Sequence, residues 1–141
     1  MNNQPLLHAI DANVILRFLV GDDRDLFAKS RLIVAAVESG EIVGTCDPVN
    51  LAEVVWVLWK FYKVPNHKIK ELLDPIIKNP GFVIPDKDRY IMALQLFSES
   101  VDHFGDACAC ATAILECEGR LLSFDRELSR VKGITRKESM G

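Results

Sequence analysis

The sequence predicts an α/β protein with one small parallel β-sheet of four to five strands and helices on both faces. Short apolar segments alternate with longer segments whose apolar residues recur at helical spacing, which is typical of consecutive βαβ units. The short segments are apolar almost throughout, which indicates strands buried on both faces. The chain of 141 residues has the size of one domain, so we expect a single domain over residues 1–141.

The apolar segments give the order of the predicted elements. The first predicted strand, Leu6 to Ile10, runs directly into Asp11. The other predicted strands are residues 41–46, 82–84, 120–125 and a short final strand at 134–136. The predicted helices are residues 14–20, 24–39, 48–62, 67–78, 87–99, 104–118 and a short one at 126–131. Right-handed crossovers would then place the carboxyl ends of the parallel strands along one edge of the sheet.

Polar residues and glycines mark the predicted helix ends. The Asp22-Asp23 pair, Asp47, Asn66 and Asp86 stand just before predicted helices. A short polar side chain at that position accepts a hydrogen bond from a free backbone N–H, so N-caps are expected there. Gly40 is expected to end the 24–39 helix in the left-handed conformation.

Composition and charge limit the classes of function. The net charge of −3 argues against a strongly basic, non-specific nucleic-acid binder, although carboxylates that bind a metal in a nuclease would also contribute to it. No apolar run approaches the ~20 residues of a membrane helix. The first five residues lack the basic region of a signal peptide. We therefore expect a cytoplasmic protein that does not span a membrane.

The four cysteines are Cys46, Cys108, Cys110 and Cys117. A zinc site that combines three of them with His103 was considered, but the spacing fits no usual zinc pattern. Small buried thiols in a reducing compartment are the favoured interpretation.

Four acids are expected near the same edge of the sheet. Asp11 and Asp125 each end a predicted strand, whereas Glu53 and Asp106 stand near the starts of predicted helices. Gathered carboxylates repel one another unless hard divalent cations neutralise them, and Mg²⁺ and Mn²⁺ prefer oxygen ligands. A carboxylate-bound metal site suits phosphodiester hydrolysis because it activates water and stabilises the reacting oxygens. An N-cap role alone would also explain Asp11, Asp106 or Asp125.

Four motifs together resemble the PIN domain, and within it the VapC-type toxins of bacterial and archaeal toxin–antitoxin pairs. They occur in the order and spacing of that family and span most of the chain. The motifs are Ile10–Arg17 followed by Asp22-Asp23, Asn50–Leu58, Phe104–Ala107 and Leu122–Asp125.

The resemblance implies a Mg²⁺- or Mn²⁺-dependent ribonuclease that is neutralised by a small antitoxin protein and forms a homodimer. Its catalytic and metal-binding acids would be Asp11, Glu53, Asp106 and Asp125. Two positions depart from the family pattern. Position 12 is usually Thr and here is Ala12, and the acid that often precedes the Phe-x-Asp motif is replaced by His103. Asp102, one residue earlier, is therefore considered as an extra acid.

Other residues are candidates to support the predicted metal site or to contact the substrate. Asn13, Ser123 and Asp102 are candidates to orient a carboxylate or a metal-bound water. Arg17 is a candidate phosphate contact for an RNA substrate. Trp56 and Trp59 could stack on bases, but a core or interface role is favoured. The basic residues of the C-terminal segment are interpreted as a solvated face; they are Arg126, Arg130, Lys132, Arg136 and Lys137.

Two alternatives to a nuclease remain open from the sequence. One is a non-catalytic PIN-like domain that only binds a partner, although the presence of all four acids argues against it. The other is a phosphoacceptor receiver domain, which is also a small parallel α/β domain with acids at strand ends. That alternative is weakened because the final predicted strand has no well-placed lysine.

Overall fold

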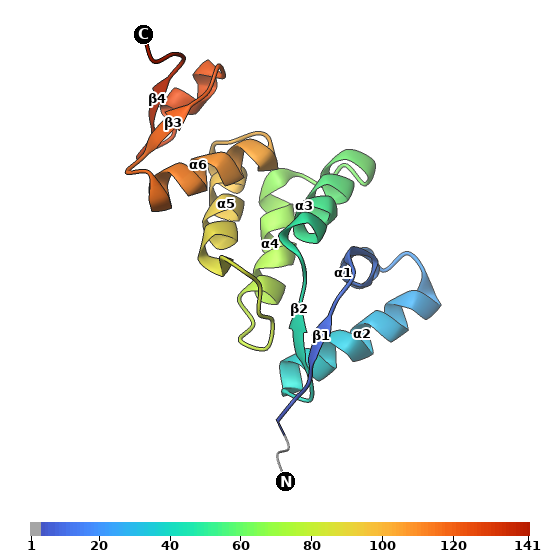
Figure 1. The fold of residues 1–141 in the computed structure, drawn as a ribbon. Helices are drawn as coiled ribbons and strands as arrows, with labels where there is room; N and C mark the ends of the chain where they lie inside the picture. The colour runs from blue at the N-terminus through green and yellow to red at the C-terminus, as the bar shows by residue number, and fades with distance from the viewer. Residues whose placement is uncertain (1–3) are drawn as a thin grey trace.

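The computed structural model describes residues 4–141 (Figure 1). Residues 1–3 lie outside this range. They are part of the predicted domain and of the N-terminal segment that was predicted not to be a signal peptide. The described elements are β1 (Leu7–Ala9), α1 (Ala12–Val20), α2 (Arg24–Ser39), β2 (Val43–Thr45), α3 (Pro48–Trp56), η1 (Val57–Phe61), α4 (Asn66–Ile77), α5 (Lys87–Glu99), α6 (Phe104–Glu116), β3 (Arg120–Leu122), η2 (Arg126–Arg130) and β4 (Thr135–Lys137).

The described strands form two separate parallel pairs, so the predicted single sheet of four to five strands is wrong. In the N-terminal sheet, β1 pairs with β2, with Leu7 opposite Val43 and Ala9 opposite Thr45. In the C-terminal sheet, β3 pairs with β4, with Arg120 opposite Thr135. The two sheets lie at different ends of the molecule, and α5 and α6 lie between them (Figure 1). The parallel pairing itself and the α/β class are as predicted.

The predicted strand at residues 82–84 is reduced to one parallel bridge, between Gly44 and Phe82. The Gly44 N–H donates to the Gly81 carbonyl at 2.8 Å, and the Val83 N–H donates to the Gly44 carbonyl at 2.7 Å. Pro85 comes directly after this segment of residues 82–84. It has no N–H to donate, which explains why the pairing does not continue.

The helices follow the sequence pattern closely, and most of their predicted ends are confirmed. Asp23 accepts a hydrogen bond from the Leu26 N–H at 3.0 Å, and Asp47 accepts one from the Val49 N–H at 2.8 Å. Gly40 ends α2 with a φ of 82°, the left-handed conformation expected of a glycine there.

Two predicted N-caps are wrong. Asn66 is the first residue of α4 rather than its cap, and its side-chain amide instead donates to the carbonyls of Phe97 and Asp102, both at 3.2 Å. Asp86 precedes α5 with a φ of 56° and makes no side-chain capping bond. In both cases a tertiary contact or a turn uses the polar residue that local propensity assigns to a cap.

The predicted helix 48–62 changes its hydrogen-bond pattern half-way. It is α-helical in α3 and becomes the π-helix η1 at Val57, where the Tyr62 N–H donates to the Val57 carbonyl at 3.1 Å. A π-helical turn rotates the following side chains around the helix axis. Sequence periodicity does not reveal such a turn, because the segment is apolar on nearly every side.

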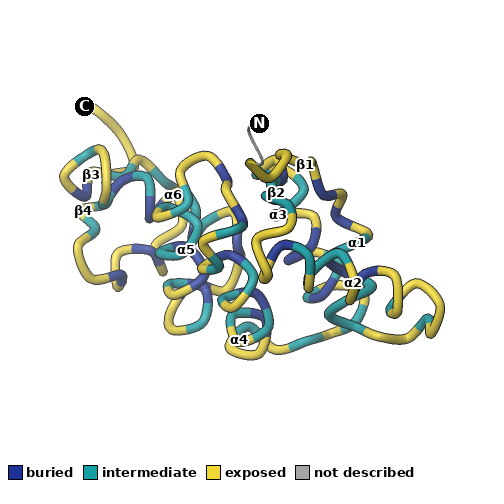
Figure 2. The backbone as a smooth tube through the Cα atoms, turned by 90° about the horizontal axis from the view of Figure 1, so that it is seen from below, coloured by how far each residue is buried: buried dark blue, intermediate teal, exposed yellow. Residues whose placement is uncertain are grey.

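The core is built mainly by helices. Figure 2 shows buried residues along the helices in the middle of the molecule, whereas β1 and most of the C-terminal sheet are exposed and β2 is half-buried to buried. In α5 and α6, Ala93, Leu94, Ala107, Cys110 and Ala111 are all fully buried. By contrast, every residue of β1 is exposed, although this strand was predicted to be buried on both faces. Among the helices of residues 4–141, none has the length and apolarity needed to cross a membrane.

Candidate metal centre

Asp11 lies where β1 passes into α1. Its carboxylate oxygen Oδ2 accepts a hydrogen bond from the Asn13 backbone N–H at 3.1 Å, so Asp11 is the N-cap of α1. A carboxylate can accept about four hydrogen bonds or metal bonds, and the cap uses one of them. Asp11 is exposed and therefore keeps oxygen atoms that can bind a cation.

Asp125 repeats this arrangement at the other sheet. It follows β3, and its Oδ1 accepts a hydrogen bond from the Glu127 N–H at 3.0 Å, which caps the short 3₁₀-helix η2. The Ser123 hydroxyl accepts a hydrogen bond from the Asp125 N–H at 3.0 Å. Ser123 therefore fixes the backbone that presents the Asp125 carboxylate, and the N-cap interpretation holds for both aspartates.

Asp106 lies in the first turn of α6 and is half-buried. Together with Asp125 it affects the thiol of Cys110, one helical turn further along. Burial, then the negative charge of Asp106, then that of Asp125, raise the pKa of Cys110. Asp106 and Asp125 therefore both lie near Cys110 of α6.

Glu53 is exposed on α3 and lines an apolar groove of about 820 Å³ between α3 and α6. The rest of the lining is almost entirely apolar or aromatic. Trp56 and Trp59 contribute from the α3 side, and Trp59 makes an edge-on contact with the His103 ring at a centroid distance of 5.4 Å. Trp56 is 59% exposed, so it is a surface residue of the groove and not part of the core.

A single chain does not gather the four acids. Within residues 4–141, no three histidine, cysteine or acidic side chains lie close enough to hold one metal ion. Asp11 belongs to the N-terminal sheet, whereas Asp106 and Asp125 belong to the region around α6 and the C-terminal sheet. The donor atoms have the right chemistry for Mg²⁺ or Mn²⁺, but the geometry of one chain does not complete the site. The metal-ligand roles therefore stay a prediction.

Comparison with known proteins shows the family of the chain. The profile of the PIN domain matches residues 9–134, and this range contains all four acids. The chain belongs to the PIN domain family. PIN domains are generally nucleases and commonly bind divalent cations, which leaves the receiver-domain alternative without support. No curated protein matches the chain.

Arg17, the candidate phosphate contact, is paired with an acidic residue of this PIN domain. Arg17 Nη1 lies 3.3 Å from Asp22 Oδ1, and the Tyr62 hydroxyl donates to Asp22 Oδ2 at 3.1 Å. The hydrogen bond to Asp22 raises the pKa of Tyr62. The sequence motif includes Asp22, but the partnership with Tyr62 spans 40 residues and gives no local signal.

Asn13 and Asp102 are exposed. Asn13 contributes its backbone N–H to the Asp11 cap, and Asp102 contributes its backbone carbonyl to Asn66. Neither contact involves the side chain that was proposed to orient a ligand, so the roles of Asn13, Asp102 and Ser123 toward a metal stay predictions.

Arg136 is not part of a solvated basic face. Its side chain is 12% exposed, and its guanidinium donates to the Ser123 carbonyl at 2.8 Å and to the Ser129 hydroxyl at 2.7 Å. It therefore ties β4 to the segment that carries Asp125. Nothing in the run of basic residues distinguishes Arg136 in sequence.

The interpretation of the cysteines as buried thiols is confirmed for Cys46 and Cys110, whereas Cys108 and Cys117 are only half-buried. Each of the four thiols, all in the described part of the chain, is free. Burial raises the pKa of Cys46 and of Cys108 to about 11, so both are neutral thiols at physiological pH. Neutral thiols are weak zinc ligands and weak nucleophiles.

Proposed function

We propose that this PIN domain is a Mg²⁺- or Mn²⁺-dependent endoribonuclease and acts as the toxin of a toxin–antitoxin pair. The observation that carries the proposal is the family match over residues 9–134, a range that contains Asp11, Glu53, Asp106 and Asp125. Acidic side chains on hard divalent cations are the usual chemistry of phosphodiester hydrolysis.

The chain contributes the ligands and their orientation. Asp11 and Asp125 are each held by a capping bond at one oxygen and keep the other oxygens for the cation. Asp106 and Glu53 would supply further oxygen ligands from α6 and α3. When bound, the cation lowers the pKa of a coordinated water and stabilises negative charge on the phosphate. Ser123 keeps Asp125 in place, and Arg17 would bind a neighbouring phosphate after releasing Asp22.

The proposed partners are an RNA substrate, a small antitoxin protein and a second copy of the chain. The groove beside Glu53 supports the antitoxin proposal because it is apolar, about 820 Å³ in volume and rimmed by the exposed Trp56. Grooves of this kind accept the apolar face of an amphipathic helix. A helix seated there would also cover Glu53.

The experiment is an RNA cleavage assay with and without Mg²⁺ or Mn²⁺, using Asp11→Asn as the decisive variant. Asn caps helices as well as Asp does, so this substitution keeps α1 intact and removes only the charge. We expect metal-dependent cleavage by the wild-type protein and a loss in the variant greater than the roughly 10–100-fold typical of losing an outer-shell partner. Unchanged metal-dependent cleavage by Asp11→Asn would refute the assignment.

A second candidate function is a non-catalytic domain that only binds a partner. The observation that favours it is that no three of the acids gather within residues 4–141 of one chain. This alternative predicts tight binding of an antitoxin-like helix, weakened by Trp56→Ala, with no cleavage of any RNA at saturating Mn²⁺. The nuclease proposal predicts that the same helix inhibits cleavage.

A further inference from the structure

Among the strands of residues 4–141, β1, β3 and β4 each have one edge that no other strand pairs with, and the edges of β1 and β3 are the ones flanked by exposed apolar side chains. In β1, the Leu6 carbonyl and the Ile10 N–H bond to β2, so the backbone groups of Leu7, Ala9 and Asp11 face the opposite, open edge. In β3, the Gly119 carbonyl and the Ser123 N–H bond to β4. The backbone groups of the alternate residues, 120, 122 and 124, therefore face a second open edge.

Apolar side chains surround both open edges. Leu6 and Leu7 at β1 are 73% and 64% exposed, and Leu122 and Phe124 at β3 are 65% and 85% exposed. A parallel strand is normally buried on both faces, and an exposed apolar strand edge recruits another strand. Each open edge can therefore pair with a parallel, apolar strand. Within the described chain, β3 is such a strand for the edge of β1, and β1 is such a strand for the edge of β3.

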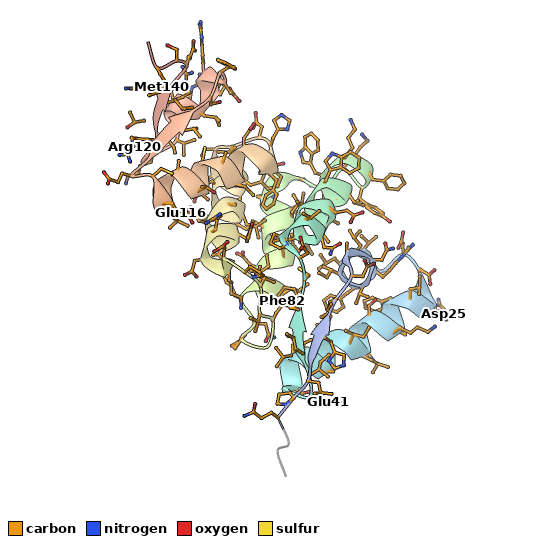
Figure 3. The ribbon with its side chains drawn as sticks, viewed as in Figure 1. Asp25, Glu41, Phe82, Glu116, Arg120 and Met140 are labelled. Carbon is orange, nitrogen blue, oxygen red and sulfur yellow. The ribbon has the colours of Figure 1, made fainter. Side chains whose placement is uncertain are left out.

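The open edges of β1 and β3 lie far apart within one chain of this structure. The C-terminal sheet lies at the far side of α5 and α6 from β1, and the labelled side chains of Arg120 and Glu41 mark the two ends (Figure 3). The rings of Phe97 and Phe104 pack edge-on at 5.8 Å between α5 and α6. At the junction of α6 and β3, the Gly119 N–H donates to the Ala113 carbonyl at 2.8 Å and the Arg120 N–H donates to the Cys117 carbonyl at 2.9 Å. These backbone hydrogen bonds hold the direction in which the chain leaves α6.

We propose that a second copy of this chain completes both sheets by reciprocal strand pairing. In the pair, β1 of each copy lies parallel to β3 of the other, giving two sheets of strand order β2-β1-β3-β4. The arrangement pairs the open edges of β1 and β3 in both copies by a closed two-fold exchange, and it leaves open the outer edge of β4, whose residues are Thr135, Arg136 and Lys137. Acidic residues outnumber basic ones over residues 4–62 and basic residues outnumber acidic ones over 117–141, so the surfaces that meet also attract each other.

The exchange also assembles the metal centre. Parallel pairing of β1 with β3 sets Asp11 and Asp125, which each follow their strand, at the same edge of the combined sheet. Asp11 and Glu53 of one copy then meet Asp106 and Asp125 of the other, so neither site is complete in one chain. This consequence rests on the proposed nuclease function, whereas the strand exchange does not.

The strand exchange is tested first without any activity, by sedimentation of the full chain at micromolar concentration. We expect a dimer for the wild-type protein and a monomer for Leu122→Pro, since proline removes the Leu122 N–H that faces the open edge and leaves the bonds to β4 intact. Leu122→Ala is the matched control, because it keeps that N–H, and should remain dimeric. A monomeric wild-type protein, or a Leu122→Pro protein that stays dimeric, would overturn the proposal.

The composite site is tested by co-expression of two inactive variants that carry different purification tags. In a mixed pair of Asp11→Asn and Asp125→Asn chains, one of the two sites receives both intact aspartates. We therefore expect about one quarter of the wild-type specific activity from a random mixture. A mixture of Asp11→Asn and Glu53→Gln places both lesions on the same side of the exchange and should stay inactive.

The outcomes of the two tests are separable. An inactive mixture of Asp11→Asn and Asp125→Asn, combined with an active wild-type dimer, would show that each site belongs to one chain and would overturn the composite site. A wild-type protein that cleaves no RNA would remove the proposed function. In that case the sedimentation of Leu122→Pro still decides the strand exchange.

Discussion

Gly44 shows how one residue limits the packing of the N-terminal sheet. A Cβ at this position would lie 2.6 Å from Ile10 Cδ1 and 3.2 Å from Val37 Cγ2, both in the buried core. We expect Gly44→Ala to lower the free energy of unfolding by about 1–3 kcal/mol, the usual cost of overpacking. Chemical denaturation measures this change.

Gly105→Ala is the matched control for Gly44→Ala. A Cβ at Gly105 meets no atom within 4 Å, and the residue lies inside α6, where Ala is preferred over Gly. This variant should be as stable as the wild-type protein or slightly more stable. Equal destabilisation by both substitutions would contradict the packing described around Gly44.

The buried thiols predict a pH dependence of stability. The pKa of Cys46 and of Cys108 rises from the ordinary 9.0 to about 11 in the folded chain. Between these values the unfolded chain loses thiol protons that the folded chain retains, so unfolding is favoured as the pH rises. We expect the free energy of unfolding to fall between pH 9 and 11, by at most about 1.4 kcal/mol per pH unit for each thiol.

The Cys46→Ala and Cys108→Ala double variant isolates this effect from other alkaline titrations, including those of Tyr62 and Tyr90. Its unfolding free energy should decline less steeply over the same pH range in urea titrations. A decline as steep as that of the wild-type protein would mean that the thiols titrate alike in both states.

Among the helices, α2 offers the cleanest test of a single capping bond. The Asp23 carboxylate accepts a hydrogen bond from the Leu26 N–H at 3.0 Å. We expect Asp23→Ala to destabilise the protein by about 1 kcal/mol. Asp25 is exposed and lies two residues after Asp23, in the first turn of α2. Asp25→Ala removes only a favourable charge near the helix N-terminus and should cost about 0.3–1 kcal/mol. Thermal unfolding of the two variants distinguishes these effects, and equal melting temperatures would contradict the cap.

Helices could be predicted from this sequence and the sheet could not, for a physical reason. The ends of α2 are fixed by neighbouring residues, Asp23 at one end and Gly40 at the other, so a local pattern describes them. The pairing of β1 depends instead on β2, which follows only after α1 and α2 and places Val43 and Thr45 opposite Leu7 and Ala9. The apolar residues of β1 predicted burial on both faces, but every residue of this strand is exposed, because a local pattern does not specify which distant segments cover a strand.

At the scale of the whole molecule, the sequence identified the family but not the arrangement of the site. The motifs around Asp11, Glu53, Asp106 and Asp125 lie within the range that matches the PIN domain. In the structure Asp11 follows β1 of one sheet and Asp125 follows β3 of the other, and no motif encodes how these two sheets are placed. Contacts between distant segments, such as that of Arg136 with the Ser123 carbonyl, also had no sequence signal.

We propose that Asp11, Glu53, Asp106 and Asp125 together hold a divalent cation. The most direct measurement is titration of the full-length protein with Mn²⁺, followed by calorimetry or by the paramagnetic resonance of the free ion. We predict that Asp11→Asn and Asp125→Asn each weaken Mn²⁺ binding by about 10-fold or more. Asp25→Asn, on the exposed face of α2, should bind as the wild-type protein does. Equal Mn²⁺ affinity in the wild-type protein and all three variants would contradict the claim.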